Sequence, residues 1–154
     1  MKPYRSVVVG TDGSERANQA VRQAAQLAAA SGARLTVVTA FVPAPRTPIA
    51  HEEEIPDEIR WRITGSAEAD EKAAEGVRIA QAEGVKDVRA RAEKGDAAAA
   101  LIEVAEDTAA DVIVVGSKGL TGASRFLLGS VPNAVSHHAP CDVLIVDTMQ
   151  GSEP

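Results

Sequence analysis

Short aliphatic runs, rich in β-branched residues, recur along the chain and are separated by longer segments rich in alanine. The runs predict β-strands at residues 7–9, 35–42, 85–92, 112–115 and 143–146. The segments between them predict helices at residues 17–30, 57–83, 97–109 and 131–138. Strands in which nearly every position is apolar, and which alternate with helices, are typical of a parallel sheet covered on both faces. The pattern therefore predicts an α/β fold.

Particular residues mark where the predicted helices begin and end. Ser14 directly precedes the first helix, Gly32 is its expected stop, and Asp96 caps the third helix. Two glycines weaken the second helix, which we expect to kink or to begin late. The strand at residues 85–92 carries several charged residues and is therefore expected at an edge of the sheet.

The length of 154 residues and the net charge of −6 limit the classes of function. The length predicts one domain over residues 1–148, followed by a polar tail at 149–154. An acidic chain with few aromatic residues lacks the basic surface and stacking platforms of nucleic-acid-binding proteins. No apolar run approaches the roughly 18 residues that span a bilayer, and no signal-peptide core is evident. The single cysteine, Cys141, fits a cytoplasmic protein.

Residues 116–130 carry the clearest chemical signal, because this stretch follows a buried strand and contains four glycines. Glycines let backbone N–H groups approach a bulky anion, and successive N–H groups form anion-binding concavities. Ser130 can cap the following helix, Pro132 suits its first turn, and the helix start would offer N–H groups to a phosphate. Lys118 and Arg125 add positive charge. The alternative to an anion-binding segment is a polar loop without a ligand, in which the glycines only form turns.

A second polar turn, residues 10–14, follows the first predicted strand. The first and fourth strands are the most uniformly apolar and form the natural central pair, so residues 10–14 and 116–130 should share one rim. Ligands of open α/β sheets bind beyond the carboxyl ends of strands where the strand order reverses. Asp12 is therefore a candidate ligand contact, and its alternative role is an Asx-type turn or a cap. No Walker loop, dinucleotide fingerprint or G-x-S-x-G elbow is present.

Three segments resemble the universal stress protein family in its single-domain, nucleotide-binding form. Gly116, Gly119, Gly129 and Ser130 meet that family's G-x-x-G-(nine residues)-G-[ST] pattern. Residues 7–14 resemble its first strand and acidic turn, and residues 138–146 resemble its closing segment. Asp142 stands where the family often has a second proline, which we expect to affect only the entry of the last strand.

The resemblance implies an open five-stranded parallel sheet of strand order 3-2-1-4-5 that binds ATP. Asp12 and the backbone near Thr11 would line the adenosine, Ala40 would contact adenine, and Gly116 would lie near the ribose. Glycines of the motif, with the start of the last helix, would hold the phosphates. The candidate binding residues are Thr11, Asp12, Gly13, Ala40, Gly116, Ser117, Lys118, Gly119, Arg125, Gly129, Ser130 and Val131.

The resemblance further implies a cytoplasmic, nucleotide-dependent stress-response regulator that binds ATP, with Mg²⁺ as its companion, or a related adenine nucleotide. It also implies a homodimer formed through the last strand, at Val143, Leu144, Ile145 and Val146; the alternative is that a helix covers this edge. We expect at most weak ATP hydrolysis, because residues 116–130 offer no general base or metal-binding carboxylate. Three alternative functions stay open: a cyclic AMP-binding member of the family, an adenylating enzyme of the ATP-pyrophosphatase type, and a ligand-free dimeric scaffold.

His137, His138 and Cys141 invite a catalytic or metal-binding interpretation. Adjacent helical residues point in different directions, however, and the spacing matches no zinc pattern. We therefore expect neither a metal site nor a catalytic residue here, with the histidines in the last turn of a helix and Cys141 as a small buried side chain.

Overall fold

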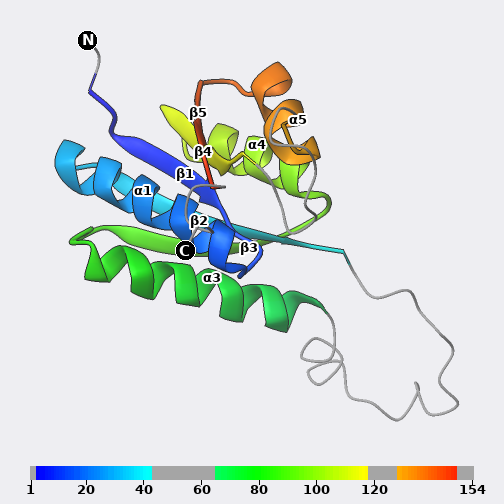
Figure 1. The fold of residues 1–154 in the computed structure, drawn as a ribbon, viewed down its shortest axis with the longest axis horizontal. Coiled ribbons are helices and arrows are strands. Elements are labelled where there is room, and N and C mark those ends of the chain that lie inside the picture. Colours follow the sequence, from blue (N-terminus) through cyan, green and yellow to red (C-terminus); the bar gives the residue numbers. More distant parts are fainter. Residues whose placement is uncertain (1–2, 43–64, 118–127, 149–154) are drawn as a thin grey trace, which may run out of the picture.

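The computed structural model describes residues 3–42, 65–117 and 128–148, in which strands and helices alternate (Figure 1). The strands are β1 (Ser6–Gly10), β2 (Arg34–Phe41), β3 (Val88–Lys94), β4 (Val112–Gly116) and β5 (Asp142–Val146). The helices are α1 (Glu15–Ser31), α3 (Gly65–Ala82), α4 (Ala97–Asp107) and α5 (Ser130–His138).

All five strands are parallel and lie in the order β3-β2-β1-β4-β5, which confirms the predicted sheet. The central strand β1 pairs with β2 on one side and with β4 on the other. Helices α1 and α3 pack on one face of the sheet, and α4 and α5 pack on the other (Figure 1). The strand order therefore reverses between β1 and β4. The helix that follows β1, α1, and the helix that follows β4, α5, pack on opposite faces of the sheet.

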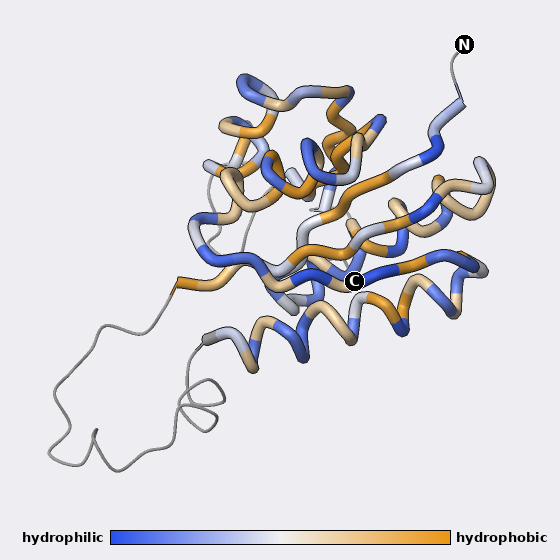
Figure 2. The backbone as a smooth tube through the Cα atoms, turned by 180° about the vertical axis from the view of Figure 1, so that it is seen from behind, coloured by the Kyte–Doolittle hydropathy of each residue, from blue (hydrophilic) through white to orange (hydrophobic). Residues whose placement is uncertain are grey.

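Two apolar cores flank the sheet, one on each face. Successive valines of β1 alternate between them: Val7 and Val9 pack toward α1 and α3, and Val8 packs toward α4 and α5. Because both faces are buried, β1 is apolar at residues 7–9 and β4 at residues 112–115, whereas β2 also buries two threonines, Thr36 and Thr39 (Figure 2). Small residues let the helices lie close to the sheet. At Gly76 of α3, an added Cβ would lie only 2.6 Å from Cγ1 of Val37.

The predicted ends of α1 and α4 are confirmed. Ser14 Oγ accepts a hydrogen bond from the N–H of Ala17 at 3.1 Å, and Asp96 Oδ1 accepts one from Ala99 at 3.0 Å. These bonds satisfy N–H groups that lack partners within a helix. Gly32 ends α1 with a φ of +66°, a left-handed conformation that glycine adopts at little cost.

The third strand begins later than predicted, at Val88 rather than at Val85. Val85 is buried in the core on the α1 and α3 side, and its N–H bonds to the carbonyl of Ala80 at the end of α3. This apolar residue therefore anchors the turn that precedes the strand. The part of the second predicted helix before Gly65 lies outside the described residues.

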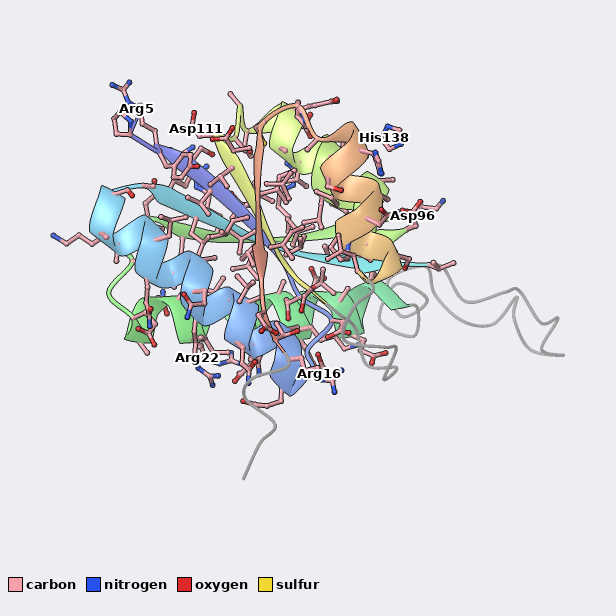
Figure 3. The ribbon with its side chains drawn as sticks, turned by 45° about the horizontal axis from the view of Figure 1, so that its top comes forward. Arg5, Arg16, Arg22, Asp96, Asp111 and His138 are labelled. Carbon is pink, nitrogen blue, oxygen red and sulfur yellow. The ribbon has the colours of Figure 1, made fainter. Side chains whose placement is uncertain are left out.

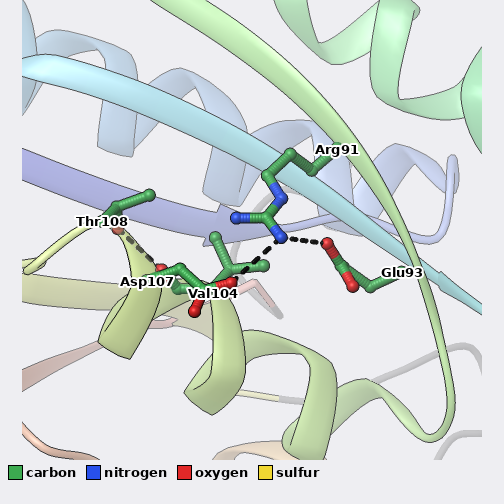
Figure 4. Close-up of polar contacts among 5 residues, drawn as sticks. All are labelled: Arg91, Glu93, Val104, Asp107 and Thr108. Atoms are coloured by element: carbon green, nitrogen blue, oxygen red, sulfur yellow. Dashed lines mark hydrogen bonds and ion pairs between the residues drawn. The ribbon is translucent and has the colours of Figure 1, made fainter.

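Strand β3 lies at the sheet edge, as its charges predict. On this strand, Arg91 pairs with Glu93 and reaches α4, where its Nη2 lies 3.2 Å from Oδ2 of Asp107 (Figure 4). At the end of the same helix, the hydroxyl of Thr108 donates to the carbonyl oxygen of Val104 at 2.7 Å (Figure 4). Charged side chains of this kind discourage pairing with a further strand.

Asp111 joins three strands at the rim opposite to the strand carboxyl ends. Its Oδ2 accepts hydrogen bonds from the N–H groups of Arg5 at 2.7 Å and Ser6 at 3.0 Å. Its own N–H donates to the carbonyl of Ser6, and its carbonyl accepts from Asp142. One residue thus fixes the starts of β1, β4 and β5 relative to one another.

We predict that Asp111→Ala lowers the free energy of unfolding by about 1–2 kcal/mol, because two backbone N–H groups lose a charged acceptor. Urea denaturation followed by circular dichroism measures the change. The matched control is Glu103→Ala, which removes the same charge from the exposed face of α4 and should change stability by less than about 0.5 kcal/mol. Equal effects of the two substitutions would contradict this role of Asp111.

Candidate functional site

A cavity of about 440 Å³ opens at the carboxyl ends of β1 and β4, between the β1–α1 turn and the start of α5. Its volume falls within the roughly 300–1,000 Å³ of small-molecule sites. The cavity lies where the strand order reverses, which is the position that the sequence predicts for a ligand-binding site. The lining residues are Gly10, Thr11, Asp12, Ser14, Arg16, Ala17, Val38, Ala40, Ala97, Leu101, Val115, Gly116, Leu128, Gly129, Ser130, Val131 and Pro132.

The β1–α1 turn forms one wall of this cavity and is held by its own hydrogen bonds. The N–H of Thr11 donates to the carbonyl of Val38 at 2.9 Å, and Thr11 Oγ1 accepts from the N–H of Gly13 at 3.1 Å. Asp12 Oδ1 accepts from the N–H of Ser14 at 2.9 Å, so that Asp12 makes the Asx-type turn and lines the cavity as well. Gly13 has a φ of +82° and shapes the turn without being one of the lining residues.

Ser117 draws together the ends of the glycine-rich segment. Its N–H donates to the carbonyl of Val146 at 2.8 Å, and its own carbonyl accepts from the N–H of Gly129 at 2.9 Å. Its Oγ accepts a further hydrogen bond from the N–H of Thr148 at 3.2 Å. Ser117 therefore acts as an anchor that places the start of α5 beside the end of β4, and it is not itself a lining residue.

Helix α5 begins at the cavity without a side chain that caps it. The predicted cap was Ser130, but Ser130 is the first helical residue and Gly129 is the N-cap. Gly129 has the extended conformation of a cap, with φ −62° and ψ 167°, and its carbonyl accepts from the N–H of Asn133. Because glycine has no side-chain acceptor, no side chain of the N-cap covers the N–H groups of Ser130 and Val131, which line the cavity at the positive end of the helix dipole; Pro132, the third helical residue, has no N–H. This arrangement suits an anion.

The deeper part of the cavity is apolar. Val38 and Ala40 come from β2, Val115 from β4 and Leu101 from α4. Leu101 packs so closely over β1 that a Cβ at Gly10 would lie 3.1 Å from its Cδ1. An apolar floor beside an anion-attracting rim can hold a ligand with one flat hydrophobic end and one anionic end.

The structure gathers most of the predicted site residues around this one cavity. Seven of them line it, namely Thr11, Asp12, Ala40, Gly116, Gly129, Ser130 and Val131. Gly13 and Ser117 support it from the turns on either side. Lys118, Gly119 and Arg125 lie outside the described residues.

Sequence reasoning missed lining residues that helices contribute, chiefly Arg16 of α1 with Ala97 and Leu101 of α4. The signal for Arg16 was its position in the first helical turn, immediately after the polar turn at residues 10–14. Ala97 is likewise the first residue of its helix. Leu101 resembles any buried leucine in a helix, and nothing in the sequence distinguishes it.

The histidines and the cysteine lie apart from this cavity. His137 and His138 are exposed in the last turn of α5, with ring centroids 6.3 Å apart and planes tilted by 54°. Cys141 is half-buried rather than fully buried, and burial raises the pKa of its thiol. Within residues 3–42, 65–117 and 128–148, no three His, Cys, Asp or Glu side chains are grouped to hold a metal ion. No helix in these ranges has the length and hydropathy of a membrane span.

Comparison with known proteins assigns the family. The model of the universal stress protein family matches residues 3–147. A universal stress protein of Mycobacterium tuberculosis is 39% identical over 148 residues, which cover 96% of this chain and 99% of that protein. A universal stress protein crystallised in complex with cAMP shares 37% identity and a TM-score of 0.71, with 96% and 99% of the two chains covered.

The universal stress protein of Archaeoglobus fulgidus, solved in complex with dAMP, has 25% identity and a TM-score of 0.64, with 94% of this chain and 98% of that chain covered. The family model and the relatives each span nearly the whole chain. The chain therefore belongs to the universal stress protein family.

Proposed function

We propose that this protein binds an adenine nucleotide, ATP or a close relative, and acts as a nucleotide-dependent regulator of the stress response in the cytoplasm. The observation that carries the proposal is the cavity at the strand-order reversal, which joins an apolar floor to a helix start without a side-chain cap. The two relatives solved with cAMP and with dAMP support adenine as the base.

We propose separate roles for the parts of the cavity in holding such a ligand. The base fits the apolar floor at Val38, Ala40 and Leu101. Asp12 suits the ribose, whose hydroxyl groups can donate to a carboxylate, because a carboxylate beside a phosphate would repel it. The phosphates fit the start of α5, where backbone N–H groups and the dipole favour negative charge.

Cyclic AMP is the second candidate ligand, and the relative of 37% identity in complex with cAMP favours it. Isothermal titration with ATP, ADP and cAMP, with and without Mg²⁺, ranks the three nucleotides. We expect binding of at least one of them at micromolar concentration. If none of the three binds at high micromolar concentration, the proposed function is wrong and a ligand-free scaffold is the better interpretation.

Substitution of Gly129 tests the role of the α5 start directly. Gly129 has a negative φ, so a side chain is compatible with its backbone. Asparagine and aspartate are equally good N-caps, so the two variants should have similar stability; neither can cap the third helical residue, Pro132, which has no N–H. We predict that Gly129→Asp binds ATP at least about tenfold more weakly than Gly129→Asn, because its carboxylate repels phosphate at close range.

Adenosine is the control ligand for this pair of variants, since it carries no phosphate and should bind both equally. Isothermal titration of ATP and adenosine measures all four affinities. Equal affinity of ATP for the Asp and Asn variants would show that the phosphates do not lie at the start of α5.

We also propose a homodimer that forms through the exposed edge of the sheet at β5. Among the residues that the structure describes, strand β5 pairs with β4 alone, and Leu144 in its middle is 41% exposed. Val143 and Ile145 pack instead against the core beneath α4 and α5. The edge thus offers unpaired backbone groups and one large apolar side chain to a second copy.

We predict that Leu144→Glu yields monomers, because a charge would be buried at the interface without a partner. Multi-angle light scattering on the purified protein measures the molar mass, and circular dichroism verifies that the variant is folded. Leu144→Met is the control that keeps an apolar side chain and should stay dimeric. A folded Glu variant that remains a dimer of unchanged affinity would place the interface elsewhere.

A further inference from the structure

The apolar floor of the cavity contains a gap in a row of side chains that crosses the sheet. Gly10, the last residue of β1, pairs in register with Val38 of β2. On its other side β1 pairs with β4, where Val115 is the next residue in the same register. Val38 and Val115 pack on the α4 and α5 side of the sheet, and all three residues line the cavity. Gly10 therefore leaves a gap between two valines.

One side chain of α4, that of Leu101, fills this gap. A Cβ placed at Gly10 would lie 3.1 Å from Cδ1 and 3.2 Å from Cδ2 of Leu101, so the two methyl groups occupy the space that a side chain at Gly10 would need. Leu101 is 3% exposed and belongs to the same apolar core as Val38 and Val115. Because it also lines the cavity, its side chain forms the boundary between the cavity and this core.

The start of α4 fixes the position of Leu101. Asp96 caps the helix with a hydrogen bond of 3.0 Å from a backbone N–H. Ala97 and Leu101 are four residues apart, so they share one face of α4, and both line the cavity. Figure 3 shows Asp96 well apart from Arg5 and Asp111, which lie at the opposite rim of the sheet. Leu101 thus lies on a capped helix, and rigid elements of this kind place specificity-determining side chains more precisely than loops do.

We propose that Leu101 determines which bases the cavity accepts, by restricting the site to purines without a further apolar substituent. The flat apolar end of a ligand meets Leu101 where the floor would otherwise open into the gap at Gly10. Protein interiors are close-packed, so a base that carries an additional apolar group finds no space there unless Leu101 moves. This inference rests on the proposed function, because it concerns the base of the same nucleotide.

The test compares ATP with three ATP analogues that carry an isopropyl group on N6, C2 or C8 of the base. The three positions cover the edges of the base, and the isopropyl group has as many carbon atoms as Leu101→Ala removes. Isothermal titration measures all affinities for the wild type and for Leu101→Ala. We expect the wild type to bind at least one analogue about tenfold or more weakly than ATP, and Leu101→Ala to raise the affinity for that analogue at least about tenfold relative to ATP.

Two further variants separate the size of the cavity from the stability of the core. Val104→Ala removes a side chain that is buried in the same core on the same helix but does not line the cavity, so it should leave every affinity ratio unchanged. Leu101→Met keeps a side chain of similar volume and should keep the wild-type ratios. Circular dichroism and the urea midpoint establish that each variant is folded.

The inference is overturned if the wild type binds all three analogues as tightly as ATP, or if Leu101→Ala leaves every ratio unchanged. An equal shift of the ratios in Val104→Ala also overturns it, because loosening of the core alone would then account for the effect. In each of these cases, ATP binding by the wild type still supports the proposed function. Should Leu101→Ala not fold, Leu101→Val is tested with methyl analogues at the same positions, and an unchanged ratio there overturns the inference. A wild type that binds neither ATP nor an analogue overturns both proposals.

Discussion

The reversal of strand order between β1 and β4 is the constraint on which the site depends. These strands are hydrogen-bonded neighbours, yet the helix after β1 packs on one face of the sheet and the helix after β4 packs on the other. The two segments that follow these strands therefore diverge at the carboxyl ends of β1 and β4. Neither helix covers the space that is left between the segments. The cavity follows from this topology, and the residues in the two turns decide what it can hold.

Local geometry also explains how a protein of net charge −6 can offer a site for an anion. Net charge governs long-range attraction, which salt screens beyond roughly 8–10 Å. Inside the cavity, the backbone N–H groups at the start of α5 carry partial positive charge, and the wall includes the Arg16 guanidinium as well as the Asp12 carboxylate. These groups are fixed by the fold, so their effect on a bound phosphate does not depend on the acidic surface elsewhere.

Much of this architecture could be predicted from the sequence, because its signals are local. Valine runs and alanine-rich segments predicted every strand and helix in the described residues, and the family resemblance supplied the strand order. Val85 was wrongly placed in a strand, since an apolar residue that packs in an αβ turn resembles a strand residue. Ser130 was wrongly predicted as the N-cap of α5. Glycine and serine are both residue types that occur at N-caps, so the sequence alone does not separate Gly129 from Ser130. Arg16 and Leu101 were missed because their role depends on packing between elements distant in sequence.

The glycine at the N-cap of α5 has a physical rationale when stability and binding are weighed together. Replacing a side-chain cap by glycine costs a helix only a few tenths of a kcal/mol. A ligand at a hundredfold excess over its Kd stabilises the folded state by about 2.7 kcal/mol. Keeping the first N–H groups of α5 open to an anion therefore costs the free protein little beside the total stabilisation that a bound ligand at that excess provides. In the proposed complex the ligand would complete the cap, and this would couple the order of the α5 start to the occupancy of the cavity.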